Sequence, residues 1–214
     1  MNKQNKQTYK TIEGALEFVK TNCKAKFDST VELHINTNLD VTKSDQMLRV
    51  SIVLPKGTGK TKRVAVLGAQ TVKNADFEIT QDYLDNVKKG KIDPKKDFDV
   101  LVAQPSFMAK LASAAQILGP AGLMPSPKSG TVTEDMEKAV EQVKRGKVEI
   151  KTETAAPVIH TILGKKSFPN ADLAENFNEI WSAIVAAKPQ KAKPGWIKSV
   201  YICTSMSPSA RLQV

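Results

Sequence analysis

The chain has 214 residues, of which 41% are hydrophobic and 25% are charged. This balance is typical of a folded globular protein with one or two domains, and it excludes wholesale disorder and a coiled coil. No apolar run approaches the roughly 20 residues that cross a bilayer, and the polar start of the chain lacks the apolar stretch of a secretory signal. We therefore expect a cytoplasmic protein.

Basic residues outnumber acidic ones, and the excess is unevenly spread. The formal net charge of +10 favours nucleic acids, acidic surfaces or membrane faces as partners. Lys and Arg outnumber Asp and Glu by ten to six in residues 1–60, by fifteen to thirteen in residues 61–155 and by seven to three in residues 156–214. A single lysine is more often only a solvated charge, but the distribution favours one basic body built from both ends.

The first part of the chain predicts one helix followed by two strands. Thr11 can cap a helix that continues to about Cys23, because apolar residues recur there at helical spacing. Apolar and polar residues then alternate at 31–35 and 48–54, which is typical of half-buried strands. The segment 55–59, with its Pro and Gly residues, ends this pattern and marks a possible domain crossing.

The middle of the chain has nearly continuous apolar runs in place of alternation. Such runs predict strands buried on both faces, and helical stretches between them indicate a parallel α/β domain. We expect strands at 64–67, 98–103 and 147–152 and helices at 81–89, 107–118 and 133–145.

The last part returns to the pattern of the first. It predicts a strand at 158–163, a helix capped by Asn170 and ended before Pro189, and a strand at 196–204. The count of elements favours a two-domain α/β (α+β) fold, in which both ends form a split βαβ sandwich around an inserted domain. The expected domains are residues 1–60 plus 156–214, and residues 61–155.

Motifs that would indicate an enzyme are weak. The Gly-Thr-Gly-Lys-Thr sequence at 57–61 lacks the first glycine of a phosphate-binding loop, because Leu54 stands there, so a basic connector is favoured. The Pro- and Gly-rich segment 119–130 could offer backbone N–H groups and Lys128 to a phosphate, or could be only a rigid loop. Its spacing is not that of a dinucleotide-binding turn. No Gly-x-Ser-x-Gly elbow occurs.

Metal chemistry has little support at this level. Cys23, Cys203, His34 and His160 form no short chelating pair, and the two cysteines match no disulfide framework. The cysteines are better interpreted as small buried residues and the histidines as polar strand residues. We expect no metal, no cofactor and no catalytic residues.

The remaining candidate residues are suited to binding contacts and not to catalysis. Lys26 and Phe27 precede Thr30 and Glu32, and Ser205-Met206-Ser207 lies near the other end of the same expected domain. A Phe ring or Met thioether can pack on a base or ribose, and hydroxyl or carboxylate groups can reach a phosphate, a 2′-OH or a guanine edge. By itself, however, Phe27 would more often be a core residue.

Seven short stretches together resemble one known family over nearly the whole chain. It is the large-subunit lateral-stalk ribosomal protein, the "L-one" family, and so many ordered matches make chance an inadequate explanation. The stretches are AKFDSTVEL at 25–33, SDQ at 44–46, LPKGTGK at 54–60, DFD at 97–99, the segment 119–132, GKKSF at 164–168 and SVY at 199–201.

The resemblance implies an RNA-binding domain formed by both ends, a Rossmann-like inserted domain and a hinge between them. It implies RNA contacts at Lys26, Phe27, Thr30, Glu32, Lys165, Ser167, Ser205, Met206 and Ser207, second-domain contacts at Gly122 and Lys128, and hinge residues Gly57, Gly59, Ala155 and Ala156.

This sequence departs from the family pattern at three positions. Ser207 replaces a glycine, and it would weaken RNA binding if that glycine provides close approach or positive φ. Ala121 stands where a basic residue is common, and Ser126 stands where Asn is usual. The second-domain contacts are therefore less well supported.

The implied function is that of a structural component of the large ribosomal subunit that binds its RNA. The resemblance further implies a mobile stalk beside exit-site tRNA, help in the release of deacylated tRNA, repression of the protein's own messenger RNA, and a free monomer in the cytoplasm or an organelle. Two alternatives stay open: an enzyme that binds a nucleotide in the inserted domain, and a basic module that binds acidic protein partners.

Overall fold

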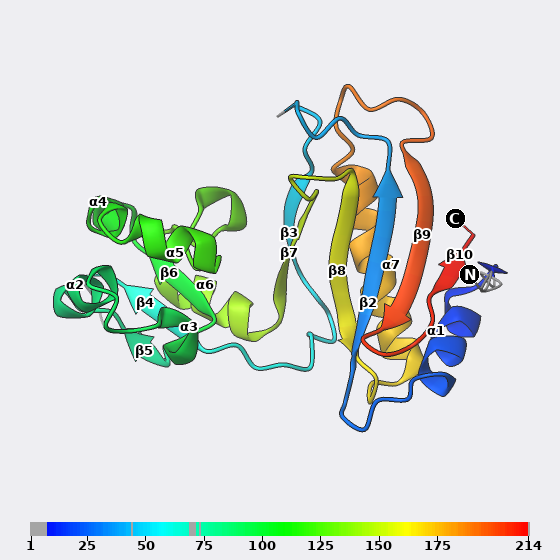
Figure 1. The fold of residues 1–214 in the computed structure, drawn as a ribbon, viewed down its shortest axis with the longest axis horizontal. Coiled ribbons are helices and arrows are strands. Elements are labelled where there is room, and N and C mark those ends of the chain that lie inside the picture. The colour runs from blue at the N-terminus through cyan, green and yellow to red at the C-terminus, as the bar shows by residue number, and fades with distance from the viewer. Residues whose placement is uncertain (1–7, 44, 69–71, 73, 214) are drawn as a thin grey trace. The chain divides into compact units, whose positions relative to one another are not determined.

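The computed structural model describes residues 8–43, 45–68, 72 and 74–213 (Figure 1). Ser44, which belongs to one of the family-like stretches, and the polar residues 1–7 lie outside this range. Among the described residues, no helix is long and apolar enough to span a membrane.

The chain divides into two compact units. Residues 1–59 and 148–214 form the first, here called the terminal unit, and residues 60–147 form the second, the inserted unit. Each unit has a hydrophobic core of its own.

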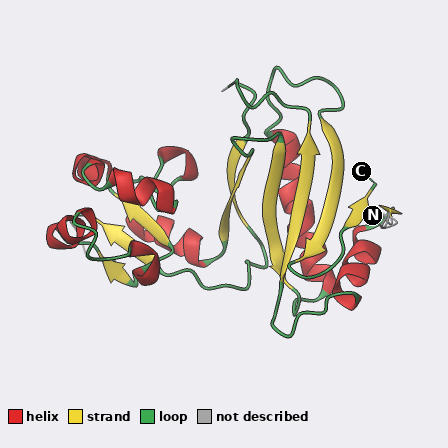
Figure 2. Cartoon of the chain, viewed as in Figure 1, coloured by secondary structure: helices red, strands yellow, loops and turns green. Residues whose placement is uncertain are grey.

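The terminal unit is built on a five-stranded sheet with the order β1-β10-β9-β2-β8 (Figure 2). Neighbouring strands are antiparallel except for the parallel pair of β1 and β10. Strands from the two ends of the chain are therefore interleaved in the sheet, with β2 lying between β9 and β8, and neither end can complete it alone. The strands are β1 Thr8–Tyr9, β2 Thr30–Thr37, β8 Val158–Lys165, β9 Ile197–Thr204 and β10 Ala210–Leu212.

Two helices, α1 Ile12–Thr21 and α7 Asn170–Ala186, pack on the sheet. Thr11 caps α1 as predicted, since its Oγ1 accepts a hydrogen bond from the Gly14 N–H at 3.4 Å. The predicted cap at Asn170 is wrong. Pro169 occupies the N-cap position with extended backbone and no side-chain cap, and Asn170 is the first helical residue.

The sheet has one covered face and one open face. Along β2, the odd-numbered residues are buried and the even-numbered residues are half-buried. This period of two follows from strand geometry, which points successive side chains to opposite faces. The buried side contributes Val31, Leu33 and Ile35 to the core with residues of both helices.

A second, two-stranded sheet pairs β3 Arg49–Val53 with β7 Lys147–Lys151. This pairing corrects the predicted boundary at residue 155, because almost all of β7 belongs to the terminal unit. Just beyond the two strands, the Thr152 N–H donates a hydrogen bond to the Leu48 carbonyl at 2.9 Å, which extends the contact between these two segments. The sequence pattern places a strand here but cannot identify its partner.

The shifted boundary also changes the distribution of charge. Lys and Arg outnumber Asp and Glu by seventeen to eleven in the terminal unit and by fifteen to eleven in the inserted unit. The contrast between the units is thus smaller than predicted. Net charge by itself does not select the terminal unit as the binding unit.

The inserted unit has a parallel three-stranded sheet with the order β5-β4-β6. The apolar runs predicted β4 and β6, but the third strand is β5 and not the predicted strand at 147–152. Alternate residues of β4 enter different core clusters: Ala65 and Leu67 enter one, Val64 and Val66 the other. Both faces of the sheet are therefore covered. The strands are β4 Val64–Leu67, β5 Phe77–Glu78 and β6 Val100–Ala103.

One predicted helix of this unit is divided into two shorter helices in the structure. The predicted helix 107–118 is interrupted at 113–114, where the Ser113 hydroxyl donates to the Lys110 carbonyl at 2.8 Å. The α-helices are α2 Gln81–Lys88, α3 Pro94–Asp97, α4 Met108–Ala112, α5 Ala115–Ala121 and α6 Met136–Lys144, and the 3₁₀ turns are Pro105–Phe107 and Pro127–Ser129.

Candidate nucleic-acid interface

Three chain segments meet at one end of the terminal sheet. β2 begins where β8 and β9 end, because it runs antiparallel to both; Thr30 pairs with Lys165, and Val31 pairs with Thr204. The Ser205 N–H donates to the Thr30 carbonyl at 3.2 Å. Sequence segments about 135 and 175 residues apart, counted from Thr30, are thereby joined.

Two large apolar side chains at this end point into solvent. Phe27 is 59% exposed and Met206 is 62% exposed, the highest values among the described large hydrophobic residues. The alternative that Phe27 is a core residue is therefore wrong. Exposed apolar groups on loops held by a rigid sheet are suited to stacking and van der Waals contact with a partner.

The loop that carries Phe27 is fixed by polar contacts. The Asp28 carboxylate accepts from the Ser167 N–H at 3.0 Å and from the Ser167 hydroxyl at 2.8 Å. The Lys165 ammonium group donates to Thr30 Oγ1 at 3.1 Å and to the Asp28 carbonyl at 3.4 Å. Lys26 is exposed beside this frame. Sequence reasoning found Lys165 and Ser167 but missed Asp28, whose position next to Phe27 was the available signal.

The turn that carries Met206 is closed by hydrogen bonds of the Ser207 hydroxyl. The Thr204 N–H donates to Ser207 Oγ at 2.9 Å, and this hydroxyl donates to the Pro208 carbonyl at 3.0 Å. No described residue other than glycine has positive φ. Ser207 therefore supports the turn without the positive φ that would require a glycine.

Beneath these loops lies a buried thiol. Cys23 Sγ is 3.2 Å from Ser29 Oγ, and the Lys166 ammonium group donates to the Cys23 carbonyl at 3.3 Å. The hydrogen bond from Ser29 is the largest of several effects that outweigh burial and lower the pKa of Cys23 to about 7.

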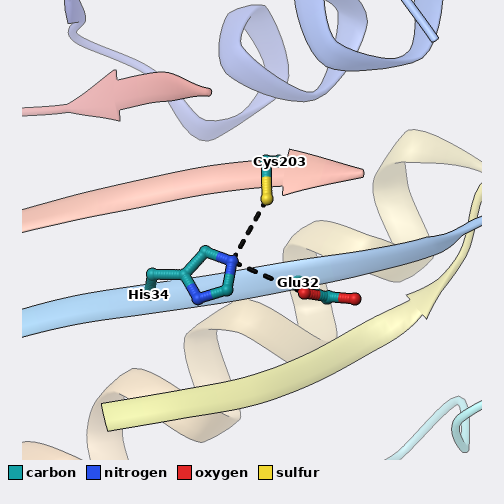
Figure 3. A group of neighbouring side chains, drawn as sticks. All are labelled: Glu32, His34 and Cys203. Carbon is teal, nitrogen blue, oxygen red and sulfur yellow. Dashed lines mark hydrogen bonds and ion pairs between the residues drawn. The ribbon is translucent and has the colours of Figure 1, made fainter. Parts of the chain in front are cut away.

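A group of polar side chains lies on the open face of the sheet, next to this end. Glu32, His34 and Cys203 each offer a ligand atom, and these atoms lie within 4.8 Å of one another (Figure 3). Burial is the main cause that lowers the pKa of His34 and raises the pKa of Cys203. Sequence spacing missed this group because Cys203 lies on another strand.

The sequence model of the ribosomal protein L1p/L10e family matches residues 19–208. The chain belongs to this family. Three relatives are each named large ribosomal subunit protein uL1. The relative from Mesoplasma florum is 41% identical over 98% of this chain and 93% of its own, that from Aster yellows witches'-broom phytoplasma 44% over 97% and 90%, and that from Mycoplasma capricolum 41% over 100% and 95%.

Membership of the L1p/L10e family confirms the resemblance predicted from the ordered stretches. It also agrees with the prediction that the protein is not an enzyme, since the relatives are named as ribosomal proteins.

The glycine-rich connector of this L1p/L10e protein is held by one buried side chain. The Asn176 amide donates to the carbonyls of Gly57 at 3.0 Å and Leu163 at 2.7 Å, and its oxygen accepts from the Lys56 N–H at 3.1 Å. The connector leads into strand β4 and not into a helix. It thus lacks the helix N-terminus on which a phosphate-binding loop depends.

The predicted hinge residues fall at different distances from the unit boundaries. Gly57 and Gly59 lie at the first boundary, and both have positive φ. Ala155 and Ala156 lie in the turn between β7 and β8, inside the terminal unit, whereas the chain crosses back at Lys147–Val148. The predicted second crossing at Ala155 and Ala156 is therefore corrected to Lys147–Val148, because the pairing of β7 with β3 places residues 148–155 in the terminal unit.

In the inserted unit, the segment 119–130 is a structured turn. Its first residues complete α5, and Gly122 ends that helix with a φ of 76°. The N–H groups of Ser129 and Gly130 donate to carbonyls within the segment. Gly122 and Lys128 are exposed, but these internal bonds leave fewer N–H groups for a phosphate than the sequence suggested.

Acidic side chains outnumber basic ones among the described residues that line a hollow of about 310 Å³ in the inserted unit. Of the charged residues that the structure describes here, Asp135, Glu137 and Glu141 are acidic and Lys138 is basic. Carboxylates repel a nucleotide's phosphates, so this hollow does not favour the nucleotide-binding alternative.

Proposed function

We propose that this protein is a structural component of the large ribosomal subunit and that it binds ribosomal RNA through the loops at one end of the terminal sheet. The observation that carries the proposal is the pair of exposed side chains, Phe27 and Met206, on loops that the sheet joins. Family membership and the names of the relatives supply the class of partner.

Each group of the interface has a distinct role in this proposal. Phe27 and Met206 pack on unstacked bases or riboses, which is a frequent mode of single-stranded RNA recognition. Lys26 and Lys165 meet phosphates. Glu32 accepts from a base edge or 2′-OH. The hydroxyl groups of Thr30, Ser167, Ser205 and Ser207 complete the polar contacts to the RNA backbone.

The finer role that we propose is a mobile lateral stalk on a cytoplasmic ribosome, beside exit-site tRNA. The protein, a monomer when free, assists release of deacylated tRNA and represses its own messenger RNA where that RNA mimics the ribosomal site. Support comes from the division into two units, with Gly57 and Gly59 at one crossing as the proposed hinge. Gly122 and Lys128 provide secondary contacts.

The test replaces the two exposed side chains. Phe27→Ala and Met206→Ala should each weaken binding to a large-subunit stalk RNA fragment by about 5- to 150-fold, corresponding to roughly 1–3 kcal/mol for a stacked base. Val185→Ala is the matched control, since Val185 is 49% exposed on α7 and belongs to no proposed contact. Unfolding in urea should be nearly the same for all variants, because exposed side chains contribute little to stability.

Binding is measured across a range of salt concentrations against a scrambled RNA of equal length. A preference for the stalk fragment that persists at high salt, and that is lost in the two variants, supports a shaped RNA site. Equal, steeply salt-dependent binding of both RNAs, with displacement by a generic polyanion, would leave only a basic protein-interaction module.

A further inference from the structure

The open face of the terminal sheet gathers one carboxylate, one imidazole and one thiol (Figure 3). Glu32 and His34 are two residues apart on β2, so both side chains project from the same face. Cys203 of β9 is the register partner of Glu32 and projects from that face too. Strand pairing thus produces a cluster that sequence spacing could not indicate.

Two of the three ligand-atom distances within this cluster approach those around a metal ion, and the third pair, Glu32 with Cys203, lies within 4.8 Å. His34 Nε2 lies 3.1 Å from Cys203 Sγ and 3.5 Å from Glu32 Oε2. Zinc holds N, O and S ligands at about 2.0–2.3 Å in a tetrahedron, which places any two ligand atoms roughly 3.3–3.7 Å apart. Displacements of a few tenths of an ångström would bring these two pairs to coordination geometry.

A fourth residue orients the imidazole from behind. His160 stands opposite His34 across β2 and β8, and the two Nδ1 atoms are 2.6 Å apart. A hydrogen bond between them requires a proton on one Nδ1; when His34 carries it, the lone pair of its Nε2 faces Glu32 and Cys203. Ligating histidines in metal sites are commonly fixed in this way through their other nitrogen.

We propose that Glu32, His34 and Cys203 form a site for a divalent zinc-type ion, with His160 as a positioning residue. Binding forms bonds from Glu32 Oε, His34 Nε2 and Cys203 Sγ to the ion, and the thiol proton leaves to solvent. The side chains of His34 and Glu32 are 27% and 36% exposed, which leaves room for water as a fourth ligand. This proposal stands on the protein alone and does not depend on RNA binding.

Cobalt(II) and zinc titrations of the full-length protein without RNA test the site. Tetrahedral cobalt bound to a thiolate gives a sulfur-to-metal charge-transfer band and intense visible bands, so a stoichiometric rise of both is expected, with reversal by zinc. Cys203→Ser should abolish the charge-transfer band. Cys23→Ser is the matched control, since Cys23 belongs to no proposed ligand set, and it should leave the band unchanged.

Two further variants separate ligands from the positioning residue. His34→Gln should remove zinc binding in competition with a chromophoric chelator. His160→Gln should weaken zinc affinity by about 10- to 100-fold while the cobalt charge-transfer band persists, because the sulfur ligand is intact. Thermal unfolding of each variant without metal verifies that the sheet is folded.

Two outcomes would overturn the proposal. The first is the absence of a charge-transfer band in folded wild-type protein at saturating cobalt, which would leave the cluster as a hydrogen-bonded polar group. The second is a band that Cys203→Ser retains and Cys23→Ser removes, which would place the metal on the buried thiol.

Discussion

At the scale of single residues, Ser207 closes the Met206 turn at the position where the family resemblance implied a glycine. The Ser207 hydroxyl both accepts from the Thr204 N–H and donates to the Pro208 carbonyl. We predict that Ser207→Gly lowers the free energy of unfolding by roughly 1 kcal/mol, because it loses these bonds and adds backbone freedom to the unfolded chain. Urea denaturation measures the change.

The matched control for that variant is Ser209→Gly, at an exposed serine two residues further along. If Ser207→Gly is as stable as the wild-type protein and binds stalk RNA more tightly, the hydroxyl does not support the turn and glycine provides closer approach to the RNA.

Cys23 gives the protein a predicted pH dependence of stability. Its pKa falls from the ordinary 9.0 to about 7 in the folded protein, with the hydrogen bond from Ser29 as the main cause. The folded state therefore binds fewer protons than the unfolded state between these values, and stability contributed by the thiolate increases from pH 7 to pH 9. This contribution is fully present above pH 9 and is lost as pH falls through 7.

Unfolding free energies of wild-type protein and Cys23→Ser, measured in urea at several pH values, isolate this effect. The difference between the two proteins should shift in favour of the wild type from pH 7 to pH 9. A difference that is constant over this range would mean that the thiol titrates at its ordinary pKa.

Part of the candidate interface could be predicted at this scale. Phe27 and Met206 were singled out by their residue types and by the family resemblance, and their exposure is a fact of the structure. The contact of Asp28 with Ser167 could not be predicted, because it joins residues 139 positions apart. The neighbourhood of Cys203 and His34 was hidden for the same reason: it depends on the register of β9 against β2.

At the scale of elements, the connector between β3 and β4 depends on a glycine for two reasons. Gly59 has a φ of +73°, and a β-carbon there would lie 2.6 Å from Lys165 Cγ and 3.0 Å from the Phe168 ring. We predict that Gly59→Ala destabilises the protein by more than the ~1–2 kcal/mol of left-handed backbone strain, and that it weakens stalk-RNA binding because Lys165 must move.

Gly90→Ala is the control for this prediction. Gly90 has a similar φ of +69°, but no described heavy atom lies within 4 Å of the position of its β-carbon. It should show the backbone strain alone and normal RNA affinity. Equal losses of stability and affinity in the two variants would rule out the contact with Lys165 as the cause.

Most elements followed from local patterns, and the exceptions have local or long-range causes. Alternation predicted β2, and capping by Thr11 predicted the start of α1. The break in the predicted helix 107–118 involves a single hydroxyl, Ser113, which the apolar spacing does not register. The partner of β7 is 100 residues away in the sequence at the contact of Arg49 with Glu149, and no local pattern encodes it.

At the scale of the whole molecule, all nine residues of the proposed main RNA contact lie in the terminal unit. We predict that replacing residues 60–147 by a short glycine linker leaves affinity for the stalk fragment unchanged, because β3 and β7 still pair and fix both ends of the linker. Filter binding at fixed salt measures the affinity, and a cooperative urea transition verifies folding.

A folded deletion variant with at least tenfold weaker binding would instead assign substantial contacts to Gly122, Lys128 or their neighbours. Domain organisation could be predicted in outline from the return of the early pattern after residue 155. The boundary itself could not, because it depends on which strands pair.

The place of β9 between β10 and β2 imposes an order on synthesis. While the protein is being translated, β2 can pair only with β8, and the turn that carries Met206 does not yet exist. A nascent chain that ends before β9 therefore contains β2 and β8 without the Met206 turn. We therefore expect a product truncated before residue 197, which lacks Ser205, Met206 and Ser207, to compete less well than intact protein for stalk RNA in a filter-binding assay.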